Sequence, residues 1–374
     1  MMGELALRYP PRSLVVSTGS EQDSAASDAR FPQLIDRVGI RATRLRTVQG
    51  LALWSWHASA LARQWRPSFT WCGELKPAGY PARWLAARRR IPYGLFVYGT
   101  ELLLVEAKIR RSRFKRLTAR SLFGDAAVII AISTWTAELA RRVLDLLDLA
   151  IPIETVPLGT TPSHFRPGVD TRALRAKYGM NGGPWLLTVA RLEWHKGIDT
   201  VIRALPAIRA AHPNTRYAVA GTGDRRGELE QMAREGGVSD AVRFLGAVSD
   251  DDLPALYNAA DLYVGASRRH DLMAEGFGIS LVEASACGVA VVGGRSAGVP
   301  DAVREGETGV LVDPEAPDAI AASVNELLAN PERRKELGAA GRRAAERFYN
   351  WDRVVSDIIR IEAAYRLPFP PAAR

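Results

Sequence analysis

The sequence predicts an α/β protein of two domains, each built on a doubly wound parallel sheet. Short β-branched and apolar runs alternate with helical periodicity along most of the chain, which is the pattern of parallel βαβ units. This alternation stops once, in a stretch rich in Pro, Gly and Thr at residues 157–182, and then begins again. A chain of 374 residues is long enough for two such domains, which we expect to face each other across a ligand-binding cleft.

The first half of the chain opens with a helical tail at residues 4–9, which Pro10 and Pro11 end because neither proline can continue a helix. The β-branched and apolar runs that follow predict strands at residues 13–17, 39–45, 69–72, 94–98, 126–133 and 154–156. Apolar residues at helical spacing predict helices at residues 54–65, 82–89, 108–123 and 136–149. We place the first domain at residues 1–168.

The second half repeats the alternation. Strands are predicted at residues 186–190, 217–220, 242–245, 262–265, 289–293 and 310–312. Helices are predicted at residues 197–211, 226–235, 253–258, 317–328, 332–348 and 351–365, the third of them capped by Ser249. We place the second domain at residues 169–350 and a final helical segment at residues 351–374.

Composition places the chain among globular proteins, with 47% hydrophobic and 24% charged residues. No apolar run approaches the length of a membrane span, and the opening residues lack the apolar core of a signal peptide. The two cysteines, Cys72 and Cys287, favour a reducing compartment over a disulfide scaffold. We therefore expect a cytoplasmic protein.

Positive charge is concentrated in the first half of the chain. Residues 1–170 hold 24 Lys and Arg against 14 Asp and Glu, whereas the remaining residues hold 26 against 27. The excess clusters at residues 83–90 and 108–120, with the aromatic residues Trp84, Phe96 and Phe114 nearby. This pattern fits a solvated face, and it also fits contact with an anionic partner such as acidic lipid headgroups or nucleic acid.

The stretch with the most chemical content is EGFGISLVEASACG at residues 275–288. A helix entered through glycines presents unpaired N–H groups that attract an anion. Glu275 before the helix and Glu283 about one turn inside it can accept hydroxyls, so the ligand should carry hydroxyls beside phosphates, as a nucleotide sugar does. In the alternative interpretation, Glu275 only favours the helix N-terminus and Glu283 is solvated.

Two cations follow the strand at residues 186–190. Arg191 and Lys196 lie where ligands bind in parallel sheets, and their charges together suit a pyrophosphate. Taken alone they would be surface residues, but the glutamate-bearing stretch makes a shared site the favoured interpretation.

Other motifs are weaker. Gly221 begins a glycine-rich turn whose third glycine is one place late for a dinucleotide loop, so we read it as a tight turn that approaches phosphate. The aspartates at residues 250–252 could bind a metal, but they follow Ser249 and open a helix, which favours capping. The five histidines show no metal-ligand spacing.

Four segments together resemble the retaining glycosyltransferases of GT-B fold, the family of bacterial phosphatidylinositol mannosyltransferases and sucrose synthase. They are VARLEWHKGIDTVIRAL, AGTGDRRGELE, VRFLGAVSDDDLPALYNAADLYV and EGFGISLVEASACGVAVVGGRSAGVPDAV, and the resemblance covers most of residues 120–366. The E-x7-E pair of Glu275 and Glu283 and the pair of Arg191 and Lys196 form its signature.

The resemblance implies roles for these residues. Arg191 and Lys196 would neutralise the donor diphosphate, Glu283 would hold the ribose and Glu275 the transferred sugar. The remaining donor-binding residues would be Phe244 and Leu245, whose backbone would lie near the base, and Gly278, Ile279, Ser280 and Leu281, whose N–H groups would cradle the diphosphate. Gly221, in the turn expected to approach phosphate, completes the donor-binding set. It also implies that residues 351–365 cross back onto the first domain, and that neither a metal nor a cofactor is needed.

Two departures from the family pattern concern the first domain. The family begins with a strand and a Gly-rich loop, and this chain is expected to lack both. Where many relatives place an active-site His, this sequence has Tyr98, while the following Gly99, Thr100 and Glu101 match the family pattern. We take these four as acceptor-side residues.

The sequence therefore predicts a cytoplasmic enzyme, peripheral on the membrane, that moves a hexose, for which we favour mannose from GDP-mannose, to a lipid-linked or other glycan acceptor. An inactive relative that binds nucleotide sugars in a regulatory role remains the alternative. Nucleic acid is disfavoured as a partner because no recognised binding module accompanies the basic clusters.

Overall fold

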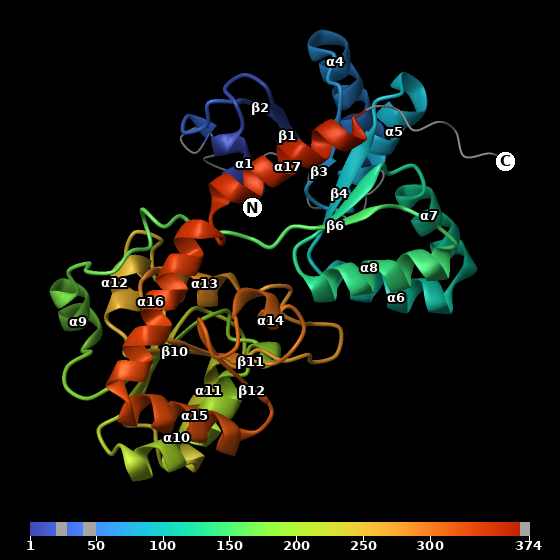
Figure 1. Ribbon diagram of the computed structural model, residues 1–374. Helices are drawn as coiled ribbons and strands as arrows, with labels where there is room; N and C mark the ends of the chain where they lie inside the picture. Colours follow the sequence, from blue (N-terminus) through green and yellow to red (C-terminus); the bar gives the residue numbers. More distant parts are fainter. Residues whose placement is uncertain (20–27, 40–49, 367–374) are drawn as a thin grey trace. The chain divides into compact units, whose positions relative to one another are not determined.

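The computed structural model describes residues 1–19, 28–39 and 50–366. The chain divides into two compact units: unit 1 contains Met1–Val156 together with the segment from Trp351 onward, and unit 2 contains Pro157–Asn350 (Figure 1). The change of unit lies at residues 156 and 157, twelve residues before the predicted domain boundary. In the described part of the chain, no helix has both the length and the apolar character needed to cross a bilayer.

Unit 1 contains two parallel sheets. Strands β1 (Val15–Gly19) and β2 (Leu34–Val38) pair with each other in a two-stranded sheet. The second sheet has the order β3-β4-β5-β6, with strands β3 (Thr70–Cys72), β4 (Tyr93–Val97), β5 (Val128–Ala131) and β6 (Ile153–Thr155). Strands β4 and β5 are fully buried, as expected for the central strands of a parallel sheet. The predicted strand at residues 39–45 lies outside the described residues except for Gly39.

Helices of unit 1 connect and cover these strands. They are α1 (Met2–Arg8), the π-helical turn η1 (Gly50–Trp54), α4 (Ser55–Trp65), α5 (Gly79–Arg89), α6 (Thr100–Arg111), α7 (Arg113–Phe123), α8 (Thr134–Leu147) and α17 (Trp351–Tyr365). Helix α17 belongs to unit 1, where it packs beside α1 and its Glu362 accepts hydrogen bonds from Tyr9 and Trp71.

One predicted helix is wrong in its extent. The sequence indicates a single basic helix at residues 108–123, but the structure has two helices, α6 and α7, that meet at Ser112. Ser112 has an extended backbone (φ −149°, ψ 119°), and its hydroxyl accepts a hydrogen bond from the Lys115 N–H as an N-cap. The serine therefore ends one helix and starts the next within a continuous run of basic residues.

Unit 2 is a doubly wound domain on one six-stranded parallel sheet. The strand order is β12-β11-β10-β7-β8-β9, with the direction of winding reversing between β7 and β10. The strands are β7 (Trp185–Val189), β8 (Arg216–Ala220), β9 (Val242–Gly246), β10 (Leu262–Gly265), β11 (Val291–Gly294) and β12 (Gly309–Val312). Ligands of such sheets bind at the carboxyl ends of the strands beside this reversal.

Helices cover both faces of this sheet. They are α9 (Arg172–Tyr178), the 3₁₀ turn η2 (Trp194–Lys196), α10 (Ile198–Ala211), α11 (Arg226–Glu235), α12 (Leu253–Asn258), α13 (Ile279–Ala286), α14 (Val299–Ala302), α15 (Pro317–Ala329) and α16 (Pro331–Arg347). Helices α10 and α15 pack on one face, and α13 packs against α16.

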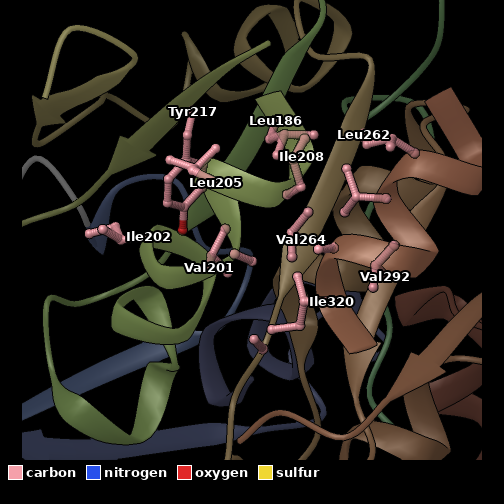
Figure 2. Packing of buried hydrophobic residues seen from close by; sticks show 14 of the residues in the cluster. Leu186, Val201, Ile202, Leu205, Ile208, Tyr217, Leu262, Val264, Val292 and Ile320 are labelled. Carbon is pink, nitrogen blue, oxygen red and sulfur yellow. The ribbon is translucent and has the colours of Figure 1, made fainter. Parts of the chain in front are cut away.

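The core of unit 2 shows how strand alternation separates the two faces. Figure 2 shows Leu262 and Val264 of β10 packed in the cluster that includes Val201 of α10 and Ile320 of α15. Tyr263 lies between them in sequence and therefore points to the opposite face, where its hydroxyl bonds to α13. The sheet is thus buried on both faces.

Candidate active site

Two loops bring the predicted residues of unit 2 together at one edge of its sheet. Strand β7 ends at Val189 and is followed by Lys196, and the neighbouring strand β10 ends at Gly265 and is followed by Glu275. Because the strands are parallel and adjacent, both loops emerge at the same edge.

Glycine allows these two loops to approach closely. Gly197 has φ +68°, and a Cβ placed on it would lie 1.9 Å from the carbonyl oxygen of Ala266, so no other residue fits without displacing backbone. The Arg268 N–H donates to the His195 carbonyl at 2.8 Å, and the Arg268 guanidinium makes a bidentate ion pair with the buried Asp199. The loop after β7 is therefore fixed to the loop after β10.

The loops end in an ion pair between two predicted site residues. Lys196 Nζ lies 2.6 Å from Glu275 Oε2, and both side chains are largely buried, with 16% and 20% exposed. Burial acts to raise the pKa of Glu275, but the positive charge and hydrogen bond of Lys196 outweigh it and hold that pKa below its usual value. Glu275 is therefore a carboxylate at neutral pH.

His195 is buried beside this pair. Its Nδ1 lies 3.1 Å from the Glu193 carboxylate. Desolvation, assisted by the charge of Lys196, lowers the pKa of His195 to about 4, so the imidazole is neutral at physiological pH. It can support the loop by hydrogen bonding without adding charge to the site.

The N-terminus of α13 adds an anion-binding element. Gly278 precedes the helix with φ +102°, a conformation that favours glycine. The N–H groups at the start of a helix have no intrahelical acceptor and attract negative charge. Of the N–H groups predicted to cradle the diphosphate, that of Leu281 already donates a hydrogen bond to the Gly278 carbonyl at 3.0 Å. The N–H groups of Ile279 and Ser280 remain suited to the predicted cradle.

Glu283 lies on the second turn of α13 and differs from Glu275 in its partners. The Tyr257 hydroxyl donates to Glu283 Oε2 at 2.7 Å, and in the described part of the chain Glu283 has no ion-pair partner. Its pKa is raised to about 7, because desolvation and, to a smaller extent, the negative charge of Asp250 outweigh the lowering effect of the Tyr257 hydrogen bond. The two predicted carboxylates are therefore electrostatically distinct.

Ser280, in the first turn of the helix, is also held by a tyrosine. Tyr263 of β10 is fully buried, and its hydroxyl lies 2.7 Å from Ser280 Oγ and 3.3 Å from the Val189 carbonyl at the end of β7. This one side chain joins two strand ends to the start of α13.

The other predicted donor residues lie on the neighbouring strands of the same unit. Arg191 is exposed, and its guanidinium pairs with Glu193 at 2.6 Å rather than with the residues of the Lys196 pair. Gly221 follows β8 with φ +137°, and a Cβ there would lie 1.9 Å from the Ala190 carbonyl. Phe244 and Leu245 of β9 line a groove of about 680 Å³ between α9 and α11.

The predicted acceptor-side residues belong to unit 1, at the start of α6. The Glu101 carboxylate accepts hydrogen bonds from the Tyr98 N–H and, at 3.3 Å, from the Gly99 N–H, so it caps its own helix. Burial raises the pKa of Glu101. Gly99 has φ +115°, and Thr100 is the first residue of α6. Their role toward an acceptor stays a prediction.

Sequence reasoning missed the residues that support this site. Tyr257 contacts Glu283 across 26 positions of the chain, Tyr263 contacts Ser280 across 17, and Arg268 contacts Asp199 across 69. Their only sequence signal is polar atoms in an otherwise apolar stretch, such as the two tyrosines of LYNAADLYV. Buried hydroxyls require partners, but a single sequence does not tell which partner.

Solved structures share this arrangement of two α/β units. The Anabaena HepE protein, crystallised with UDP and glucose, aligns over 97% of this chain and 95% of its own with a TM-score of 0.77 and 19% identity. The sucrose-phosphate synthase of Thermosynechococcus elongatus aligns over 89% of this chain and 83% of its own, with a TM-score of 0.71 and 21% identity. The protein therefore has the GT-B fold, as predicted.

Sequence comparison identifies the family. The profile described as "Glycosyl transferases group 1" matches residues 170–344. A GDP-mannose-dependent alpha-(1-6)-phosphatidylinositol monomannoside mannosyltransferase of Mycobacterium tuberculosis is 33% identical over 77% of this chain and 76% of its own length. The enzyme of the same name from Mycolicibacterium smegmatis is 37% identical, over 63% of this chain and 62% of its own length. The chain belongs to the group 1 glycosyltransferases, as the motifs predicted.

Proposed function

We propose that the protein transfers mannose from GDP-mannose to a lipid-linked or other glycan acceptor with retention of anomeric configuration. The observation that carries the proposal is the assembly of Lys196, Glu275, Glu283 and the N-terminus of α13 at one edge of a parallel sheet. Cationic and N–H groups beside hydroxyl acceptors match a nucleotide sugar. The guanine base and the mannose follow from the names of the relatives.

In this proposal each group of the site contacts a different part of the donor. Lys196 and Arg191 compensate the diphosphate, together with the N–H groups at the start of α13. Glu275 accepts hydroxyls of the sugar, since its ion pair keeps it ionised, and Glu283 accepts hydroxyls of the ribose. Phe244 and Leu245 lie beside the base.

The reaction breaks the bond between the anomeric carbon and the diphosphate oxygen and forms a bond from an acceptor hydroxyl oxygen on the same face of the sugar. The hydroxyl proton passes to the departing phosphate. Lys196 and the helix N-terminus stabilise the charge that develops on the leaving group, so we propose that no metal is required. Retention and metal independence both rest on the family resemblance and on these groups.

The surface of unit 1 supports a lipid acceptor and contact with an anionic membrane. In the described part of the chain, all ten exposed large hydrophobic side chains belong to unit 1; they are Leu7, Leu34, Leu53, Trp56, Trp65, Trp84, Leu104, Phe114, Leu117 and Ile359. The Arg88 guanidinium lies over the Trp84 ring, 4.8 Å from its centroid. Basic groups interleaved with exposed tryptophans suit the headgroup region of an acidic bilayer. Phe96, expected beside the basic clusters, is instead buried in β4.

A donor screen tests the proposed reaction. Purified protein is incubated with GDP-mannose, UDP-glucose or ADP-glucose and a membrane-lipid extract containing phosphatidylinositol mannosides, with and without EDTA. We expect release of GDP from GDP-mannose, a mannosylated lipid with the donor's anomeric configuration by NMR, and no effect of EDTA. Binding of GDP without turnover of any donor would instead favour the inactive nucleotide-sugar-binding relative.

Vesicle sedimentation tests the proposed membrane contact separately. We expect binding to vesicles containing phosphatidylglycerol or phosphatidylinositol, little binding to pure phosphatidylcholine, and loss of binding as salt rises. The double substitution Phe114→Ser and Leu117→Ser should weaken binding without changing GDP affinity. Equal binding to neutral and acidic vesicles would contradict the role given to the basic residues.

A further inference from the structure

The Tyr257 hydroxyl contacts the Glu283 carboxylate at a single oxygen atom. The Glu283 side chain has three rotatable bonds, is half-buried, and lacks an ion-pair partner among the described residues. Fixing such a side chain during ligand binding costs rotamer entropy. The hydrogen bond from Tyr257 to Oε2 is the contact that orders the carboxylate before a ligand binds.

Tyr257 is well placed to act as that fixed point. It lies on α12 with its side chain fully buried, and its ring packs at 5.8 Å centroid distance against both Phe165 and Tyr263. A ring held on two sides cannot swing, so its hydroxyl is presented in one direction. Because the hydroxyl takes up one lone pair of Oε2, Oε1 and the remaining lone pair stay available to accept hydroxyls.

We propose that Tyr257 is a positioning residue whose hydroxyl orients the Glu283 carboxylate to accept the ribose hydroxyls of a nucleoside diphosphate. This inference rests on the proposed function, because it assigns ribose recognition to Glu283. It differs from a purely structural role, in which Tyr257 would only satisfy its own buried hydroxyl.

The groups around Glu283 determine how its charge responds to pH. Tyr257 of α12 donates to it, while the negative charge of Asp250 opposes its ionisation. Tyr263 of β10 and Cys287 at the end of α13 are close enough for its charge to raise their own pKa values. On α16, Arg342 is bonded to the Ala286 carbonyl and paired with Glu346, so it is committed elsewhere.

The test measures GDP affinity by calorimetry between pH 5.5 and 9. A carboxylate with a pKa of about 7 is ionised above that pH, so affinity should fall as pH drops through 7. Removing the hydrogen bond in Tyr257→Phe raises the pKa of Glu283 further. We expect the midpoint of the pH profile of GDP affinity to move up by about one pH unit. GDP affinity at pH 7 should fall about five- to tenfold and recover near pH 9.

Three controls isolate the ribose hydroxyls, the tyrosine and the glutamate. GDP lacking both ribose hydroxyls titrates its phosphates as GDP does, and its affinity should not respond to Tyr257→Phe. Tyr217→Phe removes another fully buried tyrosine hydroxyl of unit 2, one bonded to Thr188 Oγ1 at 2.7 Å, and should leave the midpoint unchanged. In a Glu283→Gln background, Tyr257→Phe should change GDP affinity less than twofold.

The outcomes separate the two hypotheses. The positioning role is overturned if Tyr257→Phe leaves the midpoint of the pH profile of GDP affinity unmoved. It is also overturned if Tyr257→Phe weakens binding of GDP and of GDP without ribose hydroxyls equally, or weakens GDP binding by the same factor in the Glu283→Gln background. Each of these outcomes leaves donor binding itself intact. A wild-type chain that binds none of GDP, UDP and ADP overturns the proposed function and this inference with it. If Tyr257→Phe does not fold, the ¹³Cζ resonance of Tyr257 in the wild type provides the readout, with an expected titration midpoint near pH 7 that is lost in Glu283→Gln. Absence of that titration contradicts the inference.

Discussion

At the scale of single residues, the site works by giving two similar carboxylates different partners. Glu275 is compensated by a cation at 2.6 Å, whereas Glu283 receives only a neutral hydroxyl at 2.7 Å. The first is therefore held ionised, and the second has a pKa near 7 because burial is not offset by a positive charge. Lys196 holds Glu275 ionised, and in the proposed function it also compensates the charge of the diphosphate.

Replacing Lys196 should remove both functions. We expect Lys196→Ala to weaken GDP binding at least tenfold, about 1.4 kcal/mol, because a cation beside the diphosphate is lost and Glu275 is left without its partner. Calorimetric titration with GDP measures this effect. Lys335→Ala, which removes an exposed lysine on α16, is the matched control and should leave affinity within twofold. Equal affinities of the two variants would contradict the site assignment.

The sequence identified the residues of this site by type but not their supports. Acids and cations after strand ends follow from general rules for parallel sheets, so Lys196 and Glu275 could be predicted to lie together. The partner of Glu283 could not, because Tyr257 is 26 positions away on another helix and a tyrosine in an apolar run fits a core equally well. Such pairings depend on tertiary packing.

For the secondary-structure elements, the site depends on the close approach of the loop after β7 to the loop after β10, which Gly197 allows. Helix boundaries in unit 2 follow the apolar periodicity and were largely predictable, as for α10 and α12. The division of α6 from α7 was not, because Ser112 lies in a run of basic residues and a serine can also be accommodated within a helix. The close approach at Gly197 is equally invisible in the sequence, since it involves Ala266 on a distant loop.

Adding one methyl group at Gly197 tests the close contact between the two loops. Gly197→Ala places a Cβ 1.9 Å from the Ala266 carbonyl oxygen at a φ of +68°, so we expect a loss of about 2 kcal/mol or more in the free energy of unfolding. Urea denaturation provides the measurement. Gly227→Ala is the matched control, because a Cβ there meets nothing within 4 Å and the position lies in α11. It should be neutral or stabilise by up to about 1 kcal/mol; equal destabilisation by both would refute the argument.

For the molecule as a whole, the pairs that join the donor-side residues to one another and to their supports lie within unit 2. Lys196 pairs with Glu275, Tyr257 with Glu283, and Tyr263 with Ser280, and each of these residues falls between Pro157 and Asn350. The linker at residues 157–168 is also part of this unit. The Arg342 guanidinium donates to the carbonyls of Pro162 and Phe165, and the Thr160 N–H donates to the Tyr349 carbonyl.

The two possible starts of the second domain can therefore be compared directly. A fragment of residues 157–350 should unfold cooperatively and bind GDP within about threefold of the full chain. A fragment of residues 169–350, which starts at the boundary expected from the sequence, loses at least five hydrogen bonds to the linker and the Phe165 ring that packs on Tyr257. We expect it to be less stable by about 2 kcal/mol or more and to bind GDP several-fold more weakly. Urea unfolding and calorimetry on both fragments decide between the boundaries. Equal stability and equal GDP affinity of the two fragments would show that the linker is dispensable. A folded 157–350 fragment without GDP affinity would show that donor binding requires unit 1.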